Sequence, residues 1–501
     1  MLKRVAGSAR SQNAVALAGI IALGLLYNAL RRLGDLRLYV VETLAIALAA
    51  GALYFIALFL LERTATKKEG ADGRGAFWLI LAGAVLFRAL LVPLVPTLSD
   101  DIYRYRWDGR VQVEGWNPYA VSPNDARLAA LRDTDWRKMP GRETPSIYPP
   151  LAEHAFRITY RALPDPVRFK LPFVLADLAI VFMLAGWVHF TGGRNWTLAV
   201  YAWNPLVIVE FAGSGHNDAS ALACVVAALL LITRWRATPS TLLLTAGALA
   251  KVFPAVLLPV ALRRAGWPRS VRSWVNAAAA AALAVGAVWR YRDAWAAIFD
   301  TLVYYESRWQ NYNASLYSLL RWLTSPELAA GVGPGVVAGL AVWAAARKMD
   351  STRAAYLLFG ATLMLAPNGY SWYFTWIVPL LVFFPNPAWL LLTILQFLSY
   401  HVLIDYQASG TWHFQEKYVW LTYGPFYALL LWQYLWAKPQ MNTDGHAQAR
   451  ENKQAGLRRV AVRRPLGRLH QKQLVNLQGR NSSNICRRAR KDGGRAWKRA
   501  R

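Results

Sequence analysis

The chain has few cysteines and lacks the motifs of familiar soluble enzymes. Only two cysteines occur among its 501 residues, Cys224 in an apolar run and Cys486 in a basic stretch near the C-terminus. Two thiols placed in this way exclude a disulfide framework and a cysteine metal site. The sequence also has no metal-ligand spacing, nucleotide-binding loop or nucleophile motif. Any chemistry must therefore come from carboxylates, cations and aromatic rings.

The apolar content excludes an ordinary soluble protein. Hydrophobic residues make up 55% of the chain, in runs of about 17 to 25 residues, which is the length that crosses a bilayer. The 23 Trp and 23 Tyr suit helix ends at the headgroup level. The first run begins near Ala14 without a clear cleavage site, so we expect no cleaved signal peptide. The composition predicts an all-α, polytopic integral membrane protein that lies in the lipid bilayer.

Basic residues between the apolar runs assign the sides of the membrane. Lys3 and Arg4 place the N-terminus in the cytoplasm, and the basic loop 63–74 lies on the same side. The long segment 96–170 is then an outer loop. Arg37 and its neighbours Arg31 and Arg32 do not fit this scheme, because they fall in a short loop that it places outside.

One apolar run, Thr241–Leu262, has basic residues at both ends and contains Lys251 and Pro254 near its centre. A re-entrant pair of half-helices explains both features. Lys251 could instead extend to the membrane surface, although it lies far from either end of the run. We therefore expect about 12 transmembrane helices plus a re-entrant segment within a domain of residues 1–437.

The C-terminal stretch 438–501 carries 18 Lys and Arg against three Asp and Glu, half of the net charge of +29. Such a tail could bind nucleic acid, but basic residues after the last span also mark a cytoplasmic side. The second interpretation needs fewer assumptions, so we expect no nucleic-acid partner. No hydrophobic period supports a folded domain there, and we expect disorder.

The segment Leu98–Tyr119 carries the most unusual polar pattern and directly follows an apolar run. Ser99 before Asp100 and Asp101 indicates a helix start, because a hydroxyl and acidic groups stabilise the free amides there. On that helix Asp101, Arg104, Tyr105 and Asp108 share one face. This pattern fits a candidate site, and it also fits a capped helix at the membrane surface.

Three further polar clusters are expected on the same outer face, and buried ionisable groups at membrane depth usually mark a substrate path. They are the turn Gly213–Asp218 with His216, Asn217 and Asp218, the loop 304–313 with Arg308, and the segment 367–373 with Tyr373. Each has a plainer interpretation. The turn could simply join two helices, and the aromatic residues could anchor helix ends in the headgroups.

Sugar transfer from a lipid phosphate fits this set of groups. A carboxylate can accept the proton of an acceptor hydroxyl, and cations can stabilise a leaving phosphate. A transporter or flippase of a lipid-linked sugar also requires carboxylates within the membrane and a re-entrant element. A third alternative is a membrane scaffold whose tail binds nucleic acid. The acidic pair lies in a long outer loop and no inverted halves are visible, which favours transfer over transport.

At these residues the chain resembles the GT-C superfamily of polyprenyl-phosphate-sugar-dependent glycosyltransferases, and within it bacterial mannosyltransferases of the glycosyltransferase family 87 type. The resemblance is carried by motifs in this order: S-D-D-I-Y-R-Y-R-W-D-G at Ser99–Gly109, G-W-N-P-Y at Gly115–Tyr119, I-Y-P-P-L at Ile147–Leu151, G-H-N-D at Gly215–Asp218, A-K-V-F-P at Ala250–Pro254 and S-W-Y at Ser371–Tyr373. The basic tail after Lys438 matches nothing in that family.

The resemblance implies an inverting transfer of a hexose, mannose above all, from a polyprenyl-phosphate donor to a lipid, glycan or protein hydroxyl at the outer face of the inner membrane. It places the family's acidic motif on Asp100 and Asp101. We predict Asp101 as the catalytic base and Asp100 as its support. The predicted substrate-binding residues are Arg104, Asp108, His216, Asn217, Asp218, Lys251, Arg308 and Tyr373. No cofactor is expected, although Asp100 and Asp101 could hold a divalent ion.

Deletion of residues 438–501 tests whether the tail is peripheral. We expect the shortened protein to keep most of its mannosyl transfer in isolated membranes, because no predicted site residue lies in the tail. Loss of all transfer, at an unchanged amount of protein in the membrane, would contradict this.

Overall fold

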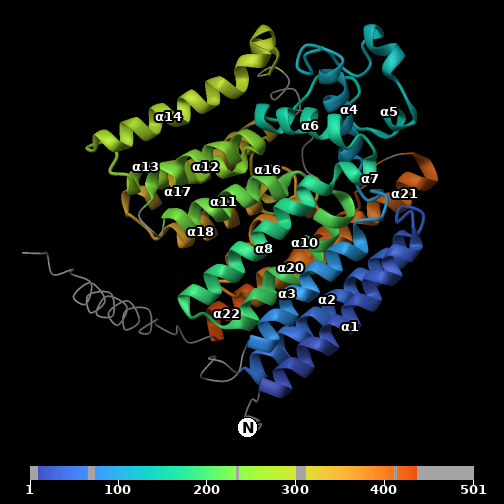
Figure 1. The fold of residues 1–501 in the computed structure, drawn as a ribbon, viewed down its shortest axis with the longest axis vertical. Coiled ribbons are helices and arrows are strands. Elements are labelled where there is room, and N and C mark those ends of the chain that lie inside the picture. The colour runs from blue at the N-terminus through green and yellow to red at the C-terminus, as the bar shows by residue number, and fades with distance from the viewer. Residues whose placement is uncertain are drawn as a thin grey trace, which may run out of the picture. The chain divides into compact units, whose positions relative to one another are not determined.

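The computed structural model describes residues 9–65, 74–232, 236–298, 300, 312–410, 412 and 414–436 (Figure 1). The chain divides into a unit of residues 1–436 and a second unit of residues 437–501. The predicted tail belongs to the second unit and lies outside the described residues. The described part is all-α and has no strand. It confirms the predicted all-α fold of a polytopic membrane protein.

Seven helical stretches of the described residues are long and apolar enough to cross a membrane. They are Arg10–Leu33, Val40–Thr64, Arg74–Leu91, Pro166–Thr191, Val271–Ile298, Pro326–Ala346 and Pro387–Ser409. The corresponding helices are α1 (Ala9–Leu33), α2 (Val40–Thr64), α3 (Arg74–Leu91), α8 (Leu171–Thr191), α14 (Val271–Val288), α17 (Pro326–Ala346) and α20 (Pro387–Leu395). The number of 12 spans stays a prediction, because several apolar runs form shorter, interrupted helices.

The shorter helices fall into two groups. Those of the predicted outer loop and its junction with α8 are α4 (Asp101–Val113), α5 (Thr134–Lys138), α6 (Pro150–Ala162) and α7 (Pro166–Phe169). The others are α9 (Leu198–Ala202), α10 (Pro205–Ile208), α11 (Asp218–Ile232), α12 (Ala237–Ala250), α13 (Leu258–Arg264), α16 (Leu316–Leu323), α18 (Ser351–Leu365), α19 (Val378–Leu381), α21 (Val402–Ser409) and α22 (Glu416–Trp436).

The predicted outer loop, residues 96–170, forms a compact helical layer at one end of the long helices. Helices α1, α2 and α3 pack together, and the chain leaves α3 directly into the start of α4, which packs along α6 (Figure 1). Tyr105 of α4 stacks on Phe156 of α6 with ring centroids 4.6 Å apart. Gly109 allows this close approach, because a Cβ there would lie 2.5 Å from the Phe156 carbonyl oxygen. Helix α4 is thereby fixed against α6.

Two of the apolar runs are interrupted next to polar residues that the sequence analysis singled out, the turn Gly213–Asp218 and Lys251. After α10 the run continues as a π-helix, Val209–Ser214, which ends at Gly215 in the left-handed conformation. The run Thr241–Leu262 breaks at Lys251, between α12 and a 3-10 turn at Phe253–Leu257. The proline after this break removes a backbone donor and disfavours a continuous helix. The predicted break is confirmed, and the re-entrant path stays a prediction.

A fully buried ion pair joins three helices of the bundle. The guanidinium of Arg88 on α3 binds both carboxylate oxygens of Asp177 on α8, at 2.5 and 3.0 Å. It also donates to the Ala202 carbonyl at 2.8 Å, and the Tyr201 hydroxyl donates to Asp177 at 2.8 Å. The two charged side chains are 1% and 0% exposed. Removal of one partner would leave the other charge buried without compensation.

We expect Asp177→Asn to lower the free energy of unfolding by about 3–5 kcal/mol, since Arg88 would keep its charge in an apolar interior. Thermal or denaturant unfolding in detergent measures the loss. Glu62→Gln is the control, because the Glu62–Arg194 pair is exposed, with its atoms 3.9 Å apart, and such pairs contribute about 0–1 kcal/mol. Equal losses in both variants would contradict the role of the buried pair.

Candidate active site

The two neighbouring carboxylates at the start of α4 have different partners. Asp100 lies 2.5 Å from the guanidinium of Arg37, which also donates to the Thr97 carbonyl at 3.0 Å. Asp101 Oδ2 lies 3.4 Å from the Tyr105 hydroxyl and 3.7 Å from His216 Nδ1. Arg37, the cation that did not fit the predicted topology, therefore has a local role as the partner of Asp100. Asp101 is the carboxylate that faces the rest of the cluster.

Burial raises the pKa of both carboxyl groups above the ordinary value for aspartate. For Asp100 the positive charge of Arg37 opposes this effect. For Asp101 the opposing charges are those of His216 and Lys251, while the negative charge of Asp218 adds to the rise in pKa. The side chain of Asp101 remains 23% exposed. Asp101 is therefore an accessible carboxylate whose raised pKa makes it a better proton acceptor once ionised.

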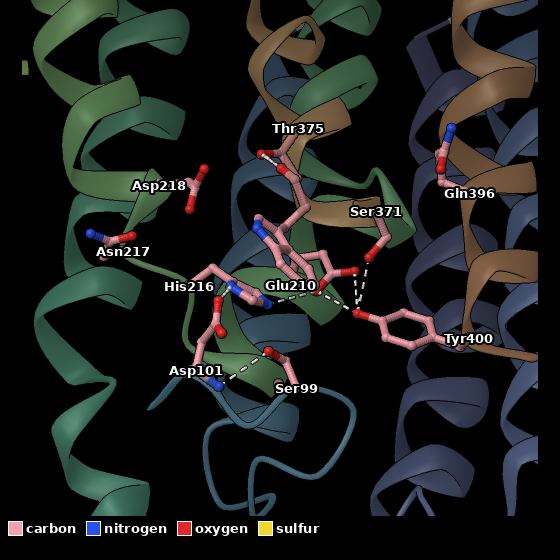
Figure 2. A network of polar contacts seen from close by, with 12 residues as sticks. Ser99, Asp101, Glu210, His216, Asn217, Asp218, Ser371, Thr375, Gln396 and Tyr400 are labelled. Carbon is pink, nitrogen blue, oxygen red and sulfur yellow. Dashed lines mark hydrogen bonds and ion pairs between the residues drawn. The ribbon is translucent and has the colours of Figure 1, made fainter. Parts of the chain in front are cut away.

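The turn from Glu210 to Asp218 brings a histidine between two carboxylates. The amide of His216 donates to the Glu210 carbonyl at 3.1 Å, which closes the turn. Gly215 adopts φ of +78°, and a Cβ there would lie 2.6 Å from Lys170 Cβ, so glycine is required. His216 Nδ1 faces Asp101, and Nε2 lies 3.4 Å from Glu210 Oε2 (Figure 2). Both contacts exceed normal hydrogen-bond lengths.

A network of buried groups holds Glu210. Its carboxylate accepts hydrogen bonds from the Tyr400 hydroxyl at 2.8 and 3.0 Å, and Ser371 donates to the same hydroxyl at 3.0 Å (Figure 2). Glu210 is fully buried. The ring of His216 stacks on Trp372 with centroids 4.1 Å apart. The histidine ring is thus oriented by a carboxylate on one side and an indole face on the other.

Asp218 and Lys251 form a second charged group beside the first. Lys251 Nζ donates to Asp218 Oδ2 at 3.0 Å, and Trp376 Nε1 donates to Oδ1 at 2.8 Å. The Lys251 side chain stays 16% exposed, whereas Asp218 is fully buried. The Lys251 ammonium also lies 5.6 Å from the centre of the Tyr373 ring. Lys251 is therefore a partly accessible cation held in place by a buried acid.

Asn217 connects these charged groups to α4. Its side-chain oxygen accepts a hydrogen bond from the Tyr105 hydroxyl at 3.4 Å, and its nitrogen donates to the Ala250 carbonyl at 3.4 Å. The start of α4, the 210–218 turn and the break after α12 therefore meet in one place. The structure brings together Asp101, His216, Asn217, Asp218, Lys251 and Tyr373, six of the ten predicted site residues.

Comparisons with known proteins give the family of the chain. Residues 9–266 match the family described as alpha-(1->6)-mannopyranosyltransferase, N-terminal domain. The chain belongs to this family. It is similar to alpha-(1->6)-mannopyranosyltransferase A of Corynebacterium glutamicum, at 27% identity over 40% of this chain and 41% of that protein. It is also similar to the protein of the same name from Mycobacterium tuberculosis, at 23% identity over 55% and 54%.

The aligned part of each mannopyranosyltransferase relative is about half of its length. No solved structure matches the chain. The family match confirms the resemblance to bacterial mannosyltransferases that the sequence motifs indicated. It includes Asp101, Glu210, the 216–218 turn and Lys251, but it ends before Trp372 and Tyr400. The last part of the chain therefore supplies groups that complete the cluster.

Arg104 and Asp108, two predicted substrate-binding residues, are already bonded within the outer loop. They form a buried pair with Nε 3.0 Å from both carboxylate oxygens, and Arg104 donates to the carbonyls of Gly141 and Thr144. Burial raises the pKa of Asp108, and raises that of the nearby Glu153 well above its ordinary value. These contacts hold the loop against α4. Their predicted role in substrate binding stays a prediction.

Two other predictions concern Arg308 and a metal ion. Arg308 lies outside the described residues. Among the residues that the structure describes, no three His, Cys, Asp or Glu side chains are grouped so that they could hold a metal ion. The candidate site is thus built from carboxylates, a histidine, a lysine and aromatic rings. The absence of a cofactor stays a prediction.

The sequence interpretation missed Glu210 and Tyr400 as parts of the network. Ser371 and Trp372 lie in the polar segment 367–373 that it expected on the same face, although it named only Tyr373 of that segment as a site residue. Glu210 could have been found, because a lone acid within an apolar run usually has a function or a specific partner. Trp376, one turn beyond the segment 367–373, is 6% exposed and donates a hydrogen bond to Asp218. It therefore packs inside the protein and does not act as a headgroup anchor, which was the plainer interpretation of the aromatic residues here.

Proposed function

We propose that this protein transfers a mannosyl residue from a polyprenyl-phosphate donor to an acceptor hydroxyl, with inversion at the anomeric carbon. The main support for this proposal is that an accessible carboxylate, Asp101, and an accessible cation, Lys251, converge at a polar centre inside an apolar bundle. Family membership supports mannosyl transfer rather than the alternative of a transporter or flippase.

Asp101 acts as the general base in this proposal. As the acceptor oxygen attacks the anomeric carbon, its proton passes to the Asp101 carboxylate, and the bond from that carbon to the phosphate oxygen breaks. Asp100 is bound to Arg37 and acts as a support. General base catalysis of this kind contributes about 10²- to 10⁴-fold to rate. His216 and Glu210 position the base, because the histidine ring is held beside Asp101 by the buried network.

Lys251 stabilises the negative charge that develops on the leaving phosphate. An ammonium donates up to three hydrogen bonds, and Asp218 uses only one of them. Asp218 thereby keeps the cation in place while leaving it available to the phosphate. Phosphate is already a good leaving group, so the proposal needs no acid. The products are the mannosylated acceptor and a polyprenyl phosphate.

The name of the two relatives, alpha-(1->6)-mannopyranosyltransferase A, supports an α-(1→6) product, and inversion then requires a β-linked donor. The aromatic faces of Tyr373 and Trp372 suit the apolar faces of a sugar ring. We propose that the site opens at the outer, periplasmic or extracellular face of the inner membrane. The positive-inside pattern supports cytoplasmic N- and C-termini. The acceptor belongs to the class of lipid, glycan or protein hydroxyls.

Asp101→Asn tests the proposed base. We expect it to lower transfer by about 10²- to 10⁴-fold, because an amide cannot accept the hydroxyl proton. The measurement is transfer of labelled mannose from polyprenyl-phosphate-mannose in membranes, together with binding of the donor, which we expect to persist. Asp100→Asn is the matched neighbour and should lose far less activity. Full activity in Asp101→Asn would overturn the assignment, and flux of the lipid-linked sugar without a new glycosidic bond would overturn transfer itself.

The pH profile tests the electrostatic surroundings of the base. Only ionised Asp101 accepts a proton, so kcat/KM should rise with pH through its pKa, which burial raises above the ordinary range. Lys251→Gln removes a charge that lowers the pKa of Asp101. We therefore expect the acid limb of the profile to move to higher pH, in addition to any loss of rate.

Lys138→Gln is the matched control for this shift. The charge of Lys138 lowers the pKa of Asp100, the neighbouring carboxyl group. The acid limb should stay in place in this variant if Asp101 is the titrating base. A limb that moves in Lys138→Gln and not in Lys251→Gln would show that Asp100 is the base.

A further inference from the structure

A cationic cavity lies where α13 and α17 end, and the proposed transfer does not use it. Its volume is about 460 Å³. Four cationic side chains line it: Arg263, Arg264, Arg269 and Lys348. Val260, Ala345 and Met349 provide an apolar part of its wall. The cavity therefore combines a concentrated positive charge with apolar surface.

Two tight turns build the cavity. In the turn after α13, Gly266 adopts φ of +102°, and a Cβ there would lie 2.7 Å from Ser270 Cβ. In the turn after α17, Lys348 adopts φ of +52°, which is uncommon for a residue with a side chain. Each turn thus contains a residue in the left-handed region, and each contributes one cation to the same cavity, Arg269 and Lys348.

Hydrogen bonds to backbone carbonyls fix two of the arginines. Arg264 Nη2 donates to the Met349 carbonyl at 2.9 Å and so joins the two turns. Arg263 Nη1 donates to the Trp267 carbonyl at 2.7 Å. A guanidinium has five N–H donors, so each arginine keeps donors for an additional acceptor. The cations are held in place without being neutralised.

The positive charge of the cavity has no acidic counterpart among the described residues. None of the four lining cations forms an ion pair with an aspartate or glutamate there. Asp350, two residues beyond Lys348, instead accepts hydrogen bonds from the amides of Thr352 and Arg353 and caps α18. A group of four cations without a carboxylate repels itself, and an anion would relieve that repulsion.

The cavity lies at the opposite end of the long helices from the Asp101 site. Helix α14 starts beside the cavity at Val271 and leads to Tyr291, which donates to Gln112 of α4 at 2.8 Å. Eighteen helical residues span about 27 Å, close to the hydrocarbon thickness of a bilayer. Trp267 and the exposed Trp274 pack together beside the cavity, as expected at a headgroup level.

We propose that this cavity binds the phosphate headgroup of an anionic phospholipid from the leaflet opposite the Asp101 site. Arginine side chains suit phosphate oxygens because their planar donors can bind two oxygens at once. The apolar wall accommodates the adjoining part of the lipid, and basic cavities between transmembrane helices bind such headgroups. The proposal is independent of the proposed transfer reaction.

Lipid retention by the full-length protein tests this site. The protein is purified in neutral detergent and titrated with phosphatidylglycerol or with phosphatidylcholine, and bound lipid is counted by native mass spectrometry. We expect one phosphatidylglycerol to be retained in preference to phosphatidylcholine. The triple variant Arg263→Gln, Arg269→Gln and Lys348→Gln should weaken that retention by roughly 100-fold, since each cation is expected to contribute about fivefold.

A matched control removes the same number of charges at the same end of the helices. Arg272→Gln, Arg347→Gln and Arg353→Gln alter three exposed arginines that do not line the cavity. Retention of phosphatidylglycerol should change little in this control, because these three arginines do not line the cavity. Equal losses in both triple variants would show diffuse attraction and would overturn the proposal.

Two further arms complete the test. Arg269→Gln alone alters an exposed side chain and leaves both carbonyl contacts of the cavity in place, so it serves if the triple variant fails to fold. It should weaken retention about fivefold.

Inorganic phosphate at millimolar concentration should displace little bound lipid. If inorganic phosphate binds as tightly as phosphatidylglycerol, the ligand is free phosphate and the lipid assignment is wrong.

Discussion

A charged side chain that leaves water for an apolar helical bundle needs an opposite charge or hydrogen-bond partners, and this requirement places the polar groups of this protein. Glu210 lies fully buried in the π-helix, where Tyr400 and His216 surround its carboxylate. The same histidine then faces Asp101 at the start of α4. The contacts of Glu210 and His216 thus connect the start of α4, the 210–218 turn and the segment that carries Tyr400.

The degree of exposure separates structural ion pairs from those that can meet a substrate. Arg88 and Asp177 are closed off, with 1% and 0% exposure, and they hold three helices. Arg104 and Asp108 hold the outer loop in a similar way. Asp101 and Lys251 keep 23% and 16% of their side chains exposed. A base and a phosphate-binding cation need access to their ligands, which is why the proposed chemistry lies with these two residues.

The two ends of the helices offer complementary chemistry. One end gathers carboxylates around Asp101, and the other gathers cations around the cavity between the α13 and α17 ends. The family match over residues 9–266 includes the acids and Lys251, while Trp372 and Tyr400 come from later segments. The cavity likewise includes Lys348, which lies beyond the matched residues. Both sites therefore depend on packing between the matched part of the chain and the helices that follow it.

The sequence alone determined what is local. Apolar runs determine an all-α membrane protein, the S-D-D start determines the beginning of α4, and Lys251 before Val252 and Pro254 marks the break after α12. Hydrophobic length and backbone chemistry act within a few residues, so they can be read from the chain. The G-H-N-D turn was recognised by its motif for the same reason.

Only the tertiary structure decided which groups meet. Glu210 and Tyr400 are 190 residues apart along the chain, and no local pattern relates them. Asp100 and Asp101 are neighbours in sequence, yet Arg37 binds the first and leaves the second facing His216. Partners of buried charges come from whichever helix packs alongside, and that packing depends on the whole bundle rather than on neighbours in sequence.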